Sequence, residues 1–264
     1  MESNQKQSLG DRHKAIEQVE AGRRADGSLP IMMRLDGHGF SKFTRGLIRP
    51  FDARLSQLMI DTTSHLVRTM SADLGYTQSD EITLVFLPTA EQQTEYLFGG
   101  KYQKLCSLAA ARATGFFNRN LSNFLPEKAH TEPEFDCRVW NVPSTHEAYL
   151  NVLSRQDDAI KNSISMAAQA VFSHKKLLGA NGQQKRDMLK EAGNPWEDRP
   201  VFFKSGTFLK RRNVVRLLTD EEFNKIPERH RPETREVIRS EIYNMQLGPL
   251  RELDDPVKTL FERE

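Results

Sequence analysis

The alternation of apolar and polar residues predicts short strands separated by longer helices. Residues 31–35 and 82–87 are apolar runs of strand length, and residues 135–142 alternate like a strand with one polar face. Helical spacing covers residues 11–21, 52–70, 101–121 and 144–172. Asp52 and Ser144 stand where helix N-caps belong, and Glu147 follows Ser144 at capping-box spacing. Gly75 is expected to end the second helix.

The order strand, helix, strand, helix, strand, helix predicts an α+β fold. We expect a palm-type, ferredoxin-like sheet with helices on one face. Past residue 204 the sequence changes to short β-like runs around a helical turn at residues 219–223. Residues 1–204 are therefore expected to form a catalytic domain, and residues 205–264 a small C-terminal appendage.

Composition narrows the class of protein. Charged residues make up 28% of the chain and hydrophobic ones 38%, and no apolar run is long enough to span a membrane. The polar N-terminus lacks the basic-then-apolar order of a secretory signal, so a cytoplasmic location is expected. The two cysteines, Cys106 and Cys137, lack metal-ligand spacing, which leaves oxygen ligands for any metal.

Three basic clusters are candidates for contact with nucleic acid, although the formal net charge is only +2. They are Arg23-Arg24, residues 174–176 and residues 204–212, which end in Lys210-Arg211-Arg212. The clusters could follow a phosphate backbone if the fold gathers them. Each taken alone could equally be solvated surface.

Two carboxylates have positions that suggest chemistry. Asp36 ends one apolar run and Asp80 lies just before another, so neighbouring strands would place both at one edge of the sheet. Two carboxylates, with phosphates and water, are sufficient ligands for Mg²⁺. A paired-ion site could activate an attacking oxygen and stabilise a leaving one. The alternative is that both residues are turn formers.

The segment after Asp36 adds a candidate phosphate loop. It reads Gly37, His38, Gly39, Phe40, Ser41. Glycines allow successive N–H groups to point into one concavity that cradles phosphate. A loop with two glycines is common, so its significance comes from its place next to Asp36.

Several segments, together covering roughly residues 9–180, resemble motifs of the tRNA-His guanylyltransferases. Residues 34–43 resemble the signature that opens the catalytic domain, and residues 76–81 resemble the second metal motif. Residues 135–139 are similar to a third motif, and residues 49–52 to a basic-Pro-x-Asp element. On this basis the chain is identified as a guanylyltransferase-like 3′-to-5′ polymerase.

The resemblance implies a set of site residues. Asp36 and Asp80 would hold two Mg²⁺ ions, with the carbonyl of Gly37 completing one site, and Glu81 and Ser79 would support this edge. Backbone amides of His38, Gly39, Phe40 and Ser41, with the side chain of Arg49, would hold a nucleoside triphosphate. The implied reaction activates a 5′-monophosphorylated tRNA with ATP or GTP, and the 3′-hydroxyl of an NTP then attacks. Relatives also imply a homo-oligomer, either a dimer or a tetramer.

One departure from the family pattern bears on the substrate. Where eukaryotic enzymes carry His-Ile-Asn-Asn-Leu-Tyr-Asn-Thr, residues 160–167 keep only Asn162, although Arg155, Gln156 and Asp158 upstream still match. This favours repair of truncated tRNA 5′ ends over strict addition of one guanosine to tRNA-His. A nucleotide cyclase-like palm enzyme and a non-catalytic RNA-binding protein are the remaining alternatives.

Overall fold

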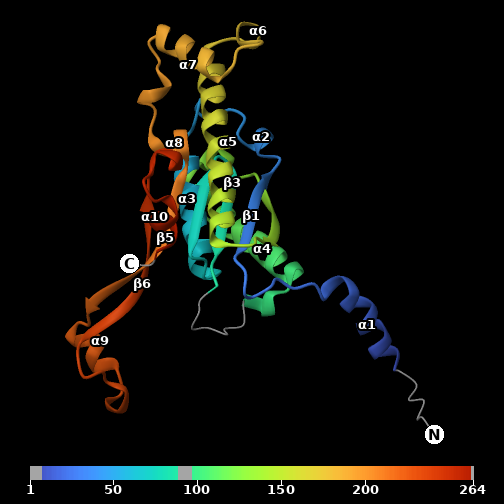
Figure 1. Ribbon diagram of the computed structural model, residues 1–264, viewed down its shortest axis with the longest axis vertical. Helices are drawn as coiled ribbons and strands as arrows, with labels where there is room; N and C mark the ends of the chain where they lie inside the picture. The colour runs from blue at the N-terminus through green and yellow to red at the C-terminus, as the bar shows by residue number, and fades with distance from the viewer. Residues whose placement is uncertain (1–7, 89–96, 263–264) are drawn as a thin grey trace.

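A computed structural model describes residues 8–88 and 97–262, and its centre is one antiparallel sheet (Figure 1). The strands are β1 (Ile31–His38), β2 (Leu74–Gln78), β3 (Glu81–Phe86), β4 (Glu134–Asn141), β5 (Thr207–Leu217) and β6 (Glu236–Met245). They are ordered β4-β1-β3-β2-β5-β6. The α+β class expected from the sequence is confirmed.

Helices precede, connect and follow these strands. The α-helices are α1 (Leu9–Ala21), α2 (Phe40–Phe43), α3 (Ala53–Thr69), α4 (Tyr102–Phe124), α5 (Thr145–Val171), α6 (His174–Leu177), α7 (Gly182–Glu191), α8 (Val201–Ser205), α9 (Asp220–Lys225) and α10 (Pro256–Phe261). Short 3₁₀ turns are η1 (Leu97–Gly100), η2 (Pro126–Lys128), η3 (Trp196–Asp198), η4 (Glu228–His230) and η5 (Leu250–Glu252). Asp52 and Ser144 cap α3 and α5, as predicted.

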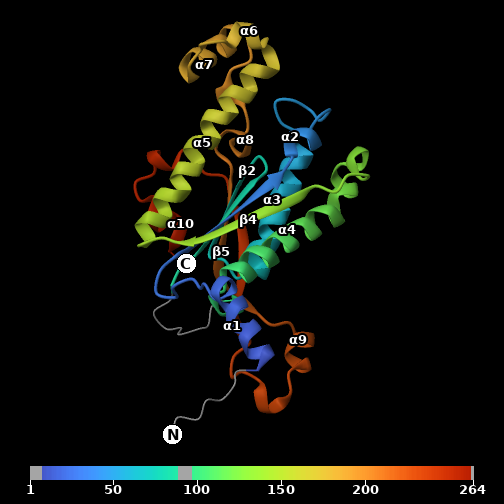
Figure 2. The same cartoon turned by 90° about the vertical axis from the view of Figure 1, so that its right-hand side faces the viewer.

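Helices cover both faces of the sheet, so the expectation of helices on one face is wrong (Figure 2). The physical reason lies in β1, where adjacent residues point to opposite faces and both sides are apolar. Met33 packs towards α3 and α4, whereas Met32 packs with Val152 and Leu153 of α5 and with Leu260 of α10. A strand that is apolar on consecutive positions needs a cover on each side.

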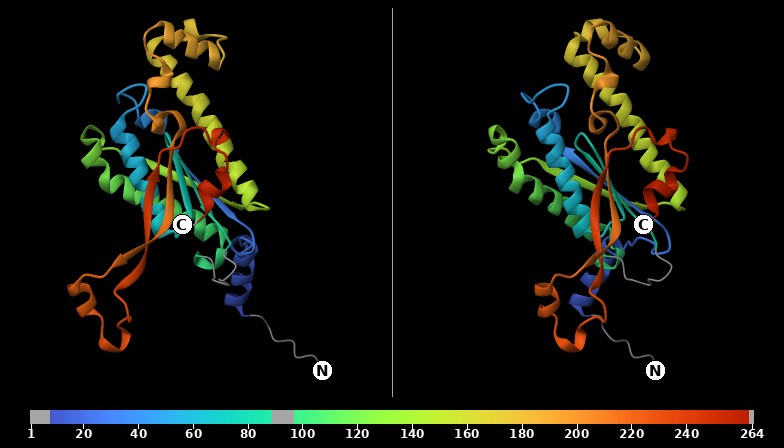
Figure 3. Two further views of the ribbon diagram at one scale, coloured as in Figure 1. Left: turned by 60° about the vertical axis from the view of Figure 1, so that its left-hand side comes forward. Right: turned by 90° about the vertical axis from the view of Figure 1, so that its left-hand side faces the viewer.

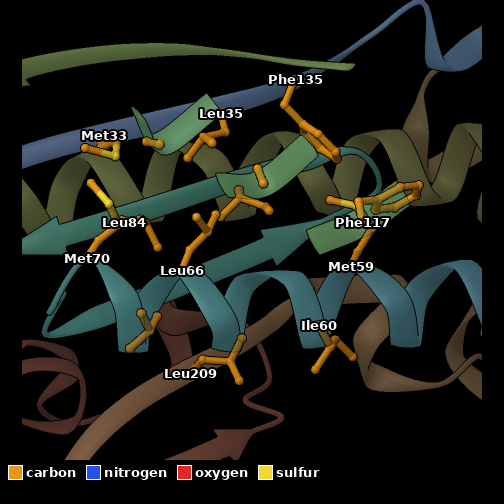
Figure 4. Close-up of a cluster of buried hydrophobic side chains, with 14 of the residues drawn as sticks. Met33, Leu35, Met59, Ile60, Leu66, Met70, Leu84, Phe117, Phe135 and Leu209 are labelled. Atoms are coloured by element: carbon orange, nitrogen blue, oxygen red, sulfur yellow. The ribbon is translucent and has the colours of Figure 1, made fainter. Parts of the chain in front are cut away.

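The larger core lies between the sheet and the pair α3 and α4 (Figure 4). Leu66 and Met70, from α3 and its C-cap, meet Leu84 of β3, and Phe117 of α4 meets Phe135 of β4. All are at most 5% exposed. At about 25 cal/mol per Å² of buried apolar surface, a layer of this kind supplies most of the force that holds the strands in register.

The segment between α3 and β2 differs from the sequence prediction, which placed the end of the helix at Gly75. Helix α3 ends at Thr69, and Gly75 lies inside β2 rather than at the helix end. A Cβ on Gly75 would lie 2.6 Å from Val67 Cγ2 and 2.8 Å from Thr63 Cγ2. The glycine therefore allows β2 to approach α3 closely.

The C-terminal strands continue the central sheet and then leave it. β5 pairs with β2 through residues 207–210, and beyond that point β5 pairs with β6 alone. Figures 1 and 3 show these strands, with α9, extending away from the body of the protein. We call residues 211–242 the arm. The second half of α5 extends in the opposite direction and carries α6 and α7.

Two further features complete the fold. Helix α1 buries none of its residues, and Ile16 and Val19 on it are 58% and 73% exposed. In the described part of the chain, no helix combines the length and apolar character needed to cross a membrane.

Candidate active site

Asp36 lies near the end of β1 on the face that α5 covers. Alternation along β1 sends Ile31, Met33 and Leu35 into the α3 and α4 core, so Asp36 shares the other face with Met32. It is partly exposed, and its register partner on β3 is Glu81. The strand thus delivers one carboxylate to the edge of the sheet.

Asp80 reaches the same edge from the β2–β3 turn. The N–H of Gly37 donates to the Asp80 carbonyl at 3.1 Å, which ties the end of β1 to this turn. Ser79 adopts a left-handed φ of 54°, and its hydroxyl lies 2.9 Å from Asp80 Oδ1, to which it donates. Asp36 and Asp80, which are distant in sequence, are therefore brought together as the sequence suggested.

The acidic edge makes ionisation of Asp80 and Glu81 less favourable, and of the described carboxyl groups there, Glu81 alone has a basic partner, Arg155. Burial raises the pKa of Asp80, and the neighbouring Asp36 raises it further, against the hydrogen bond from Ser79. Burial also raises the pKa of Glu81, although Arg155 and Arg34 lower it. Within residues 8–88 and 97–262, no basic side chain forms an ion pair with Asp36 or Asp80. This pair of hard oxygen ligands suits a divalent cation such as Mg²⁺.

The loop after β1 combines a left-handed glycine with a short helix. Gly39 has φ 67° and ψ 19°, and α2 follows at once. Successive left- and right-handed residues turn adjacent N–H groups towards one side, which suits an anion. Phe40 anchors the loop, because it is 3% exposed and packs its ring against Phe43, Phe117 and Phe135. His38 is exposed.

A cavity of about 430 Å³ adjoins this edge. Three residues predicted for nucleotide binding line it: Ser41, Arg49 and Ser79. Asp36, Gly37, Asp80 and Glu81 lie beside the cavity rather than in its wall. The structure thus gathers nearly all predicted site residues in one region, with Phe40 serving as the buried anchor.

The sequence interpretation missed the far wall of the cavity. Met166, Gln169 and Ala170 from α5 and Phe202 and Phe203 from α8 complete the lining. The ring of Phe51, on the near wall, lies 4.7 Å from that of Phe203 and 5.2 Å from that of Phe202. No local pattern marks these residues, because only tertiary packing brings α8 to this place.

The near wall is held in place by a buried carboxylate. Asp52 accepts hydrogen bonds from the Arg54 side chain and the N–H of Ile48, and Arg54 also pairs with Glu127 at 2.7 Å. The Arg54 side chain holds the pKa of Asp52 below its ordinary value. Residues 48–52 are therefore fixed before any ligand enters.

Arg155 and Gln156, two residues of α5 that match the family pattern, have different roles. Arg155 pairs with Asp158 at 2.6 Å, and it also reaches Glu81 at 3.4 Å, so it connects α5 to the acidic edge. Gln156 is fully buried and bonds to the carbonyls of Ser205 and Gly248 and to the N–H of Leu250. Gln156 is thus a structural residue that holds the C-terminal segment.

The basic cluster at residues 210–212 is not a free phosphate-binding patch. Lys210 is 3% exposed and its ammonium donates to the Thr259 carbonyl. Arg211 donates to the carbonyls of Val67 and Ala72, and Arg212 pairs with Glu241 at 3.8 Å. The charge run joins the arm to α3 and α10, whereas the predicted clusters Arg23-Arg24 and residues 174–176 are exposed.

Comparisons with known proteins identify the family. A family model described as tRNAHis guanylyltransferase (Thg1) matches residues 13–143. A bacterial tRNA(His) guanylyltransferase (Thg1)-like protein, solved in complex with ATP, is 35% identical with a TM-score of 0.72, covering 78% of this chain and 87% of that one. Another such bacterial structure, in complex with GTP, is 26% identical with a TM-score of 0.71, covering 92% and 94%.

A viral relative extends the range of similar proteins. The uncharacterized protein R259 of Acanthamoeba polyphaga mimivirus is 28% identical over 228 residues, which cover 78% of each chain. Together with the acidic edge and its cavity, these matches decide the family. The chain belongs to the tRNA-His guanylyltransferase (Thg1) family and is a nucleotidyltransferase of that family.

Proposed function

We propose that this enzyme adds nucleotides to the 5′ end of tRNA in the 3′-to-5′ direction, in repair of truncated 5′ ends. The observation that carries the proposal is the meeting of Asp36 and Asp80 at the edge of the sheet, directly beside the cavity. Carboxylates next to a nucleotide-sized space are the arrangement that metal-assisted phosphoryl transfer requires.

The cavity is proposed to hold the nucleotide. Its volume of about 430 Å³ lies in the range of small-molecule sites, which is about 300–1,000 Å³. Phe51 and Phe202 offer aromatic surface for a base, while Arg49 and Ser41 offer donors for phosphate. The bacterial relatives solved with ATP and GTP support nucleoside triphosphates as ligands.

Asp36, Asp80 and the carbonyl of Gly37 are proposed to hold two Mg²⁺ ions. When bound, such ions activate an attacking hydroxyl and neutralise charge on phosphate oxygens. The residues themselves fix position: Gly37 and Ser79 orient the Asp80 turn, and Arg155 orients Glu81 beside it. Since positioning and charge neutralisation carry phosphoryl transfer, the site needs no side-chain nucleophile.

The reaction is proposed to have two stages. In the first stage a 5′-phosphate oxygen of tRNA bonds to the α-phosphorus of ATP or GTP, and pyrophosphate leaves. In the second stage the 3′-hydroxyl of an incoming NTP bonds to the tRNA 5′ phosphorus, and the nucleoside monophosphate leaves. Both stages use the edge of the sheet at Asp36 and Asp80, because in each stage an oxygen forms a bond to a phosphorus atom next to these carboxylates. Which of ATP and GTP serves activation is an outcome of the experiment below.

The altered segment of α5 supports repair over strict guanosine addition. Ile164 and Ala167 are buried with Trp196 and Phe203, and Ser163 accepts a hydrogen bond from the Trp196 indole at 3.0 Å. These side chains are therefore used in packing and offer nothing to a tRNA. With fewer protein donors and acceptors for discrimination, pairing with the opposite strand would supply specificity.

A homo-oligomer is also proposed. Exposed apolar side chains on the arm support it, because Val215 and Ile238 are register partners with Leu217 beside them, and contiguous exposed apolar surface usually marks an interface. Ile16 and Val19 on α1 are a separate exposed apolar pair. The dimer and tetramer would be distinguished by sedimentation velocity.

The decisive experiment supplies 5′-monophosphorylated tRNA-His, full-length or lacking its first nucleotide, with Mg²⁺ and each NTP, both alone and together with ATP or GTP for activation. We expect extension of the truncated tRNA by the NTP that pairs with the opposing base, in preference to guanosine addition to the full-length tRNA. If both substrates compete in one tube and unpaired guanosine addition wins, strict guanylylation replaces repair. If no NTP is added to either, the proposed function is wrong.

A further inference from the structure

Two arginines face each other across β1 and β4. The register places Arg34 directly opposite Arg138, on the face of the sheet that carries Asp36. Side chains directly opposite in an antiparallel pair have Cβ atoms about 4.5–5.5 Å apart, and like charges there destabilise the sheet. Acidic neighbours offset part of this repulsion, because Arg138 pairs with Asp136 and Arg34 acts on Glu81, and an anion between the two guanidiniums would remove the rest.

Arg34 and Thr83 each have a buried polar atom without a hydrogen-bond partner. Among the described residues, the Arg34 side chain forms no hydrogen bond or ion pair, and its Nε is buried without an acceptor, although its charge acts on Glu81 and lowers the pKa of that carboxyl. Thr83, its register partner on β3, is 1% exposed, and its hydroxyl is also unsatisfied. Buried polar groups normally have partners, so the Arg34 Nε and the Thr83 hydroxyl are available to a ligand. Arg155 on α5 differs, because it already pairs with Glu81 and Asp158.

The pair can be reached from solvent. β4 is an edge strand, and its residues on this face, Glu134, Asp136 and Arg138, are exposed. Arg138 holds only a half-exposed ion pair with Asp136 at 3.3 Å, which is weak and easily exchanged.

The pair also lies on the opposite side of Asp36 from the cavity. Strand rise places Arg34 about 7 Å before Asp36, whereas the loop to the cavity begins after it. A ligand at the arginines and a nucleotide in the cavity would therefore meet at the carboxylates.

We propose that Arg34 and Arg138, with the Thr83 hydroxyl, form a phosphate subsite for the 5′ phosphate of the RNA substrate. The guanidinium fork matches phosphate oxygens, and the hydroxyl can donate a further bond. The assignment to RNA rests on the proposed function. It is favoured because an open sheet edge admits the end of a large molecule. The polyphosphate of a second nucleotide has the same chemistry and is the other source to be tested.

The test measures binding, in Mg²⁺ without NTP, of labelled tRNA bearing either a 5′ phosphate or a 5′ hydroxyl, by fluorescence anisotropy. For the wild type we expect the phosphorylated form to bind about tenfold more tightly, the size of one charge-assisted contact. Arg34→Gln and Arg138→Gln should bring the two affinities close to equality. Arg239→Gln is the control, because it removes an exposed arginine from the arm and should leave the ratio unchanged.

Two further readouts separate the possible results. Arg138→Gln should melt at or above the wild-type temperature, since it removes a like-charge pair, so loss of the ratio is not unfolding. NTP affinity, measured in parallel, should be the same in the variants and in the wild type. If the variants bind NTP more weakly but still prefer 5′-phosphorylated over 5′-hydroxyl tRNA, the subsite holds a polyphosphate rather than the RNA 5′ phosphate. If neither the ratio nor the NTP affinity changes, the subsite does not exist. Nucleotide addition by the wild type is scored separately, so the subsite can fail while the proposed function stands, and the reverse.

Discussion

Replacing Gly37 by alanine should disrupt the candidate site through packing rather than through backbone conformation. A Cβ at this position would lie 2.3 Å from Phe40 Cδ2 and 2.6 Å from Cε2. The ring cannot turn aside easily, because Phe43, Phe117 and Phe135 surround it at centroid distances of 5.0–5.7 Å. Either Phe40 leaves its place in the core or the end of β1 moves away from Asp80.

The expected cost follows from overpacking, which destabilises proteins by about 1–3 kcal/mol. Nucleotide addition should fall more steeply, by about 100-fold, since a shift of about 1 Å at a positioned group has that effect. Urea unfolding measures the first quantity and single-turnover addition to truncated tRNA the second. Both should recover partly in the double variant Gly37→Ala, Phe40→Leu, because the smaller side chain makes room for the new methyl group.

Gly39→Ala is the matched control. Its Cβ would have no heavy atom within 4 Å, but its φ of 67° is left-handed. Gly39→Ala should lower the free energy of unfolding by about 1–2 kcal/mol because of that left-handed conformation, whether or not Phe40→Leu is also present. A double-mutant cycle therefore separates the two glycines. Coupling below about 0.5 kcal/mol between Gly37→Ala and Phe40→Leu would refute the packing argument.

Three further predictions follow from charges placed by the fold. Asp80→Asn should abolish nucleotide addition but stabilise the protein when EDTA is present. Because burial raises the pKa of Asp80 in the folded state, ionisation of this carboxyl opposes folding, and the gain in urea midpoint should grow as the pH rises above about 4 and vanish below it. A gain that does not depend on pH would contradict this reasoning. Arg211→Ala should lower the free energy of unfolding by about 1–3 kcal/mol, because it removes the side-chain donor to the buried Ala72 carbonyl and one of the two donors to the Val67 carbonyl, which keeps only the Ala72 N–H. The exposed control Arg239→Ala should stay within about 0.5 kcal/mol of wild type, and equal effects would return Arg211 to ordinary surface. The thiol of Cys106 accepts a hydrogen bond from Cys137, which lowers the pKa of Cys106 to about 7. Alkylation of Cys106 by iodoacetamide should therefore rise with a midpoint near pH 7, and this midpoint should move to higher pH in Cys137→Ala. Peptide mass spectrometry across pH measures both midpoints, and equal midpoints would exclude the contact.

Local sequence signals predicted the elements that build the acidic edge. Asp52 was recognisable as a helix cap because an N-cap acts locally: its side chain bonds to the N–H of Arg54, only two residues away, so the sequence around it is sufficient evidence. Asp36 was recognisable as a strand-end residue because β1 is apolar up to that point. The short strand β2 was missed, since Gly75 and Thr77 interrupt its apolar pattern and their suitability depends on the approach of α3.

Long-range contacts account for what local reasoning could not provide. The spacing of residues 145–171 predicts an apolar helix face but does not indicate that this face covers the side of the sheet opposite α3 and α4. The basic run at residues 210–212 is chemically the same whether it meets RNA or carbonyl groups, and only the pairing of β5 with β2 decides between them. Arg34 and Arg138 became a pair only when the register was known.

The two walls of the cavity come from distant parts of the chain, and this affects how the protein can evolve. The carboxylates and the near wall belong to residues 36–80, whereas the far wall belongs to residues 166–170 and 202–203. Substitutions in the later part can change which molecules fit while the acidic edge stays intact. Descendants of one gene could thus acquire new substrates by drift in α5 and α8 while inheriting the same reaction.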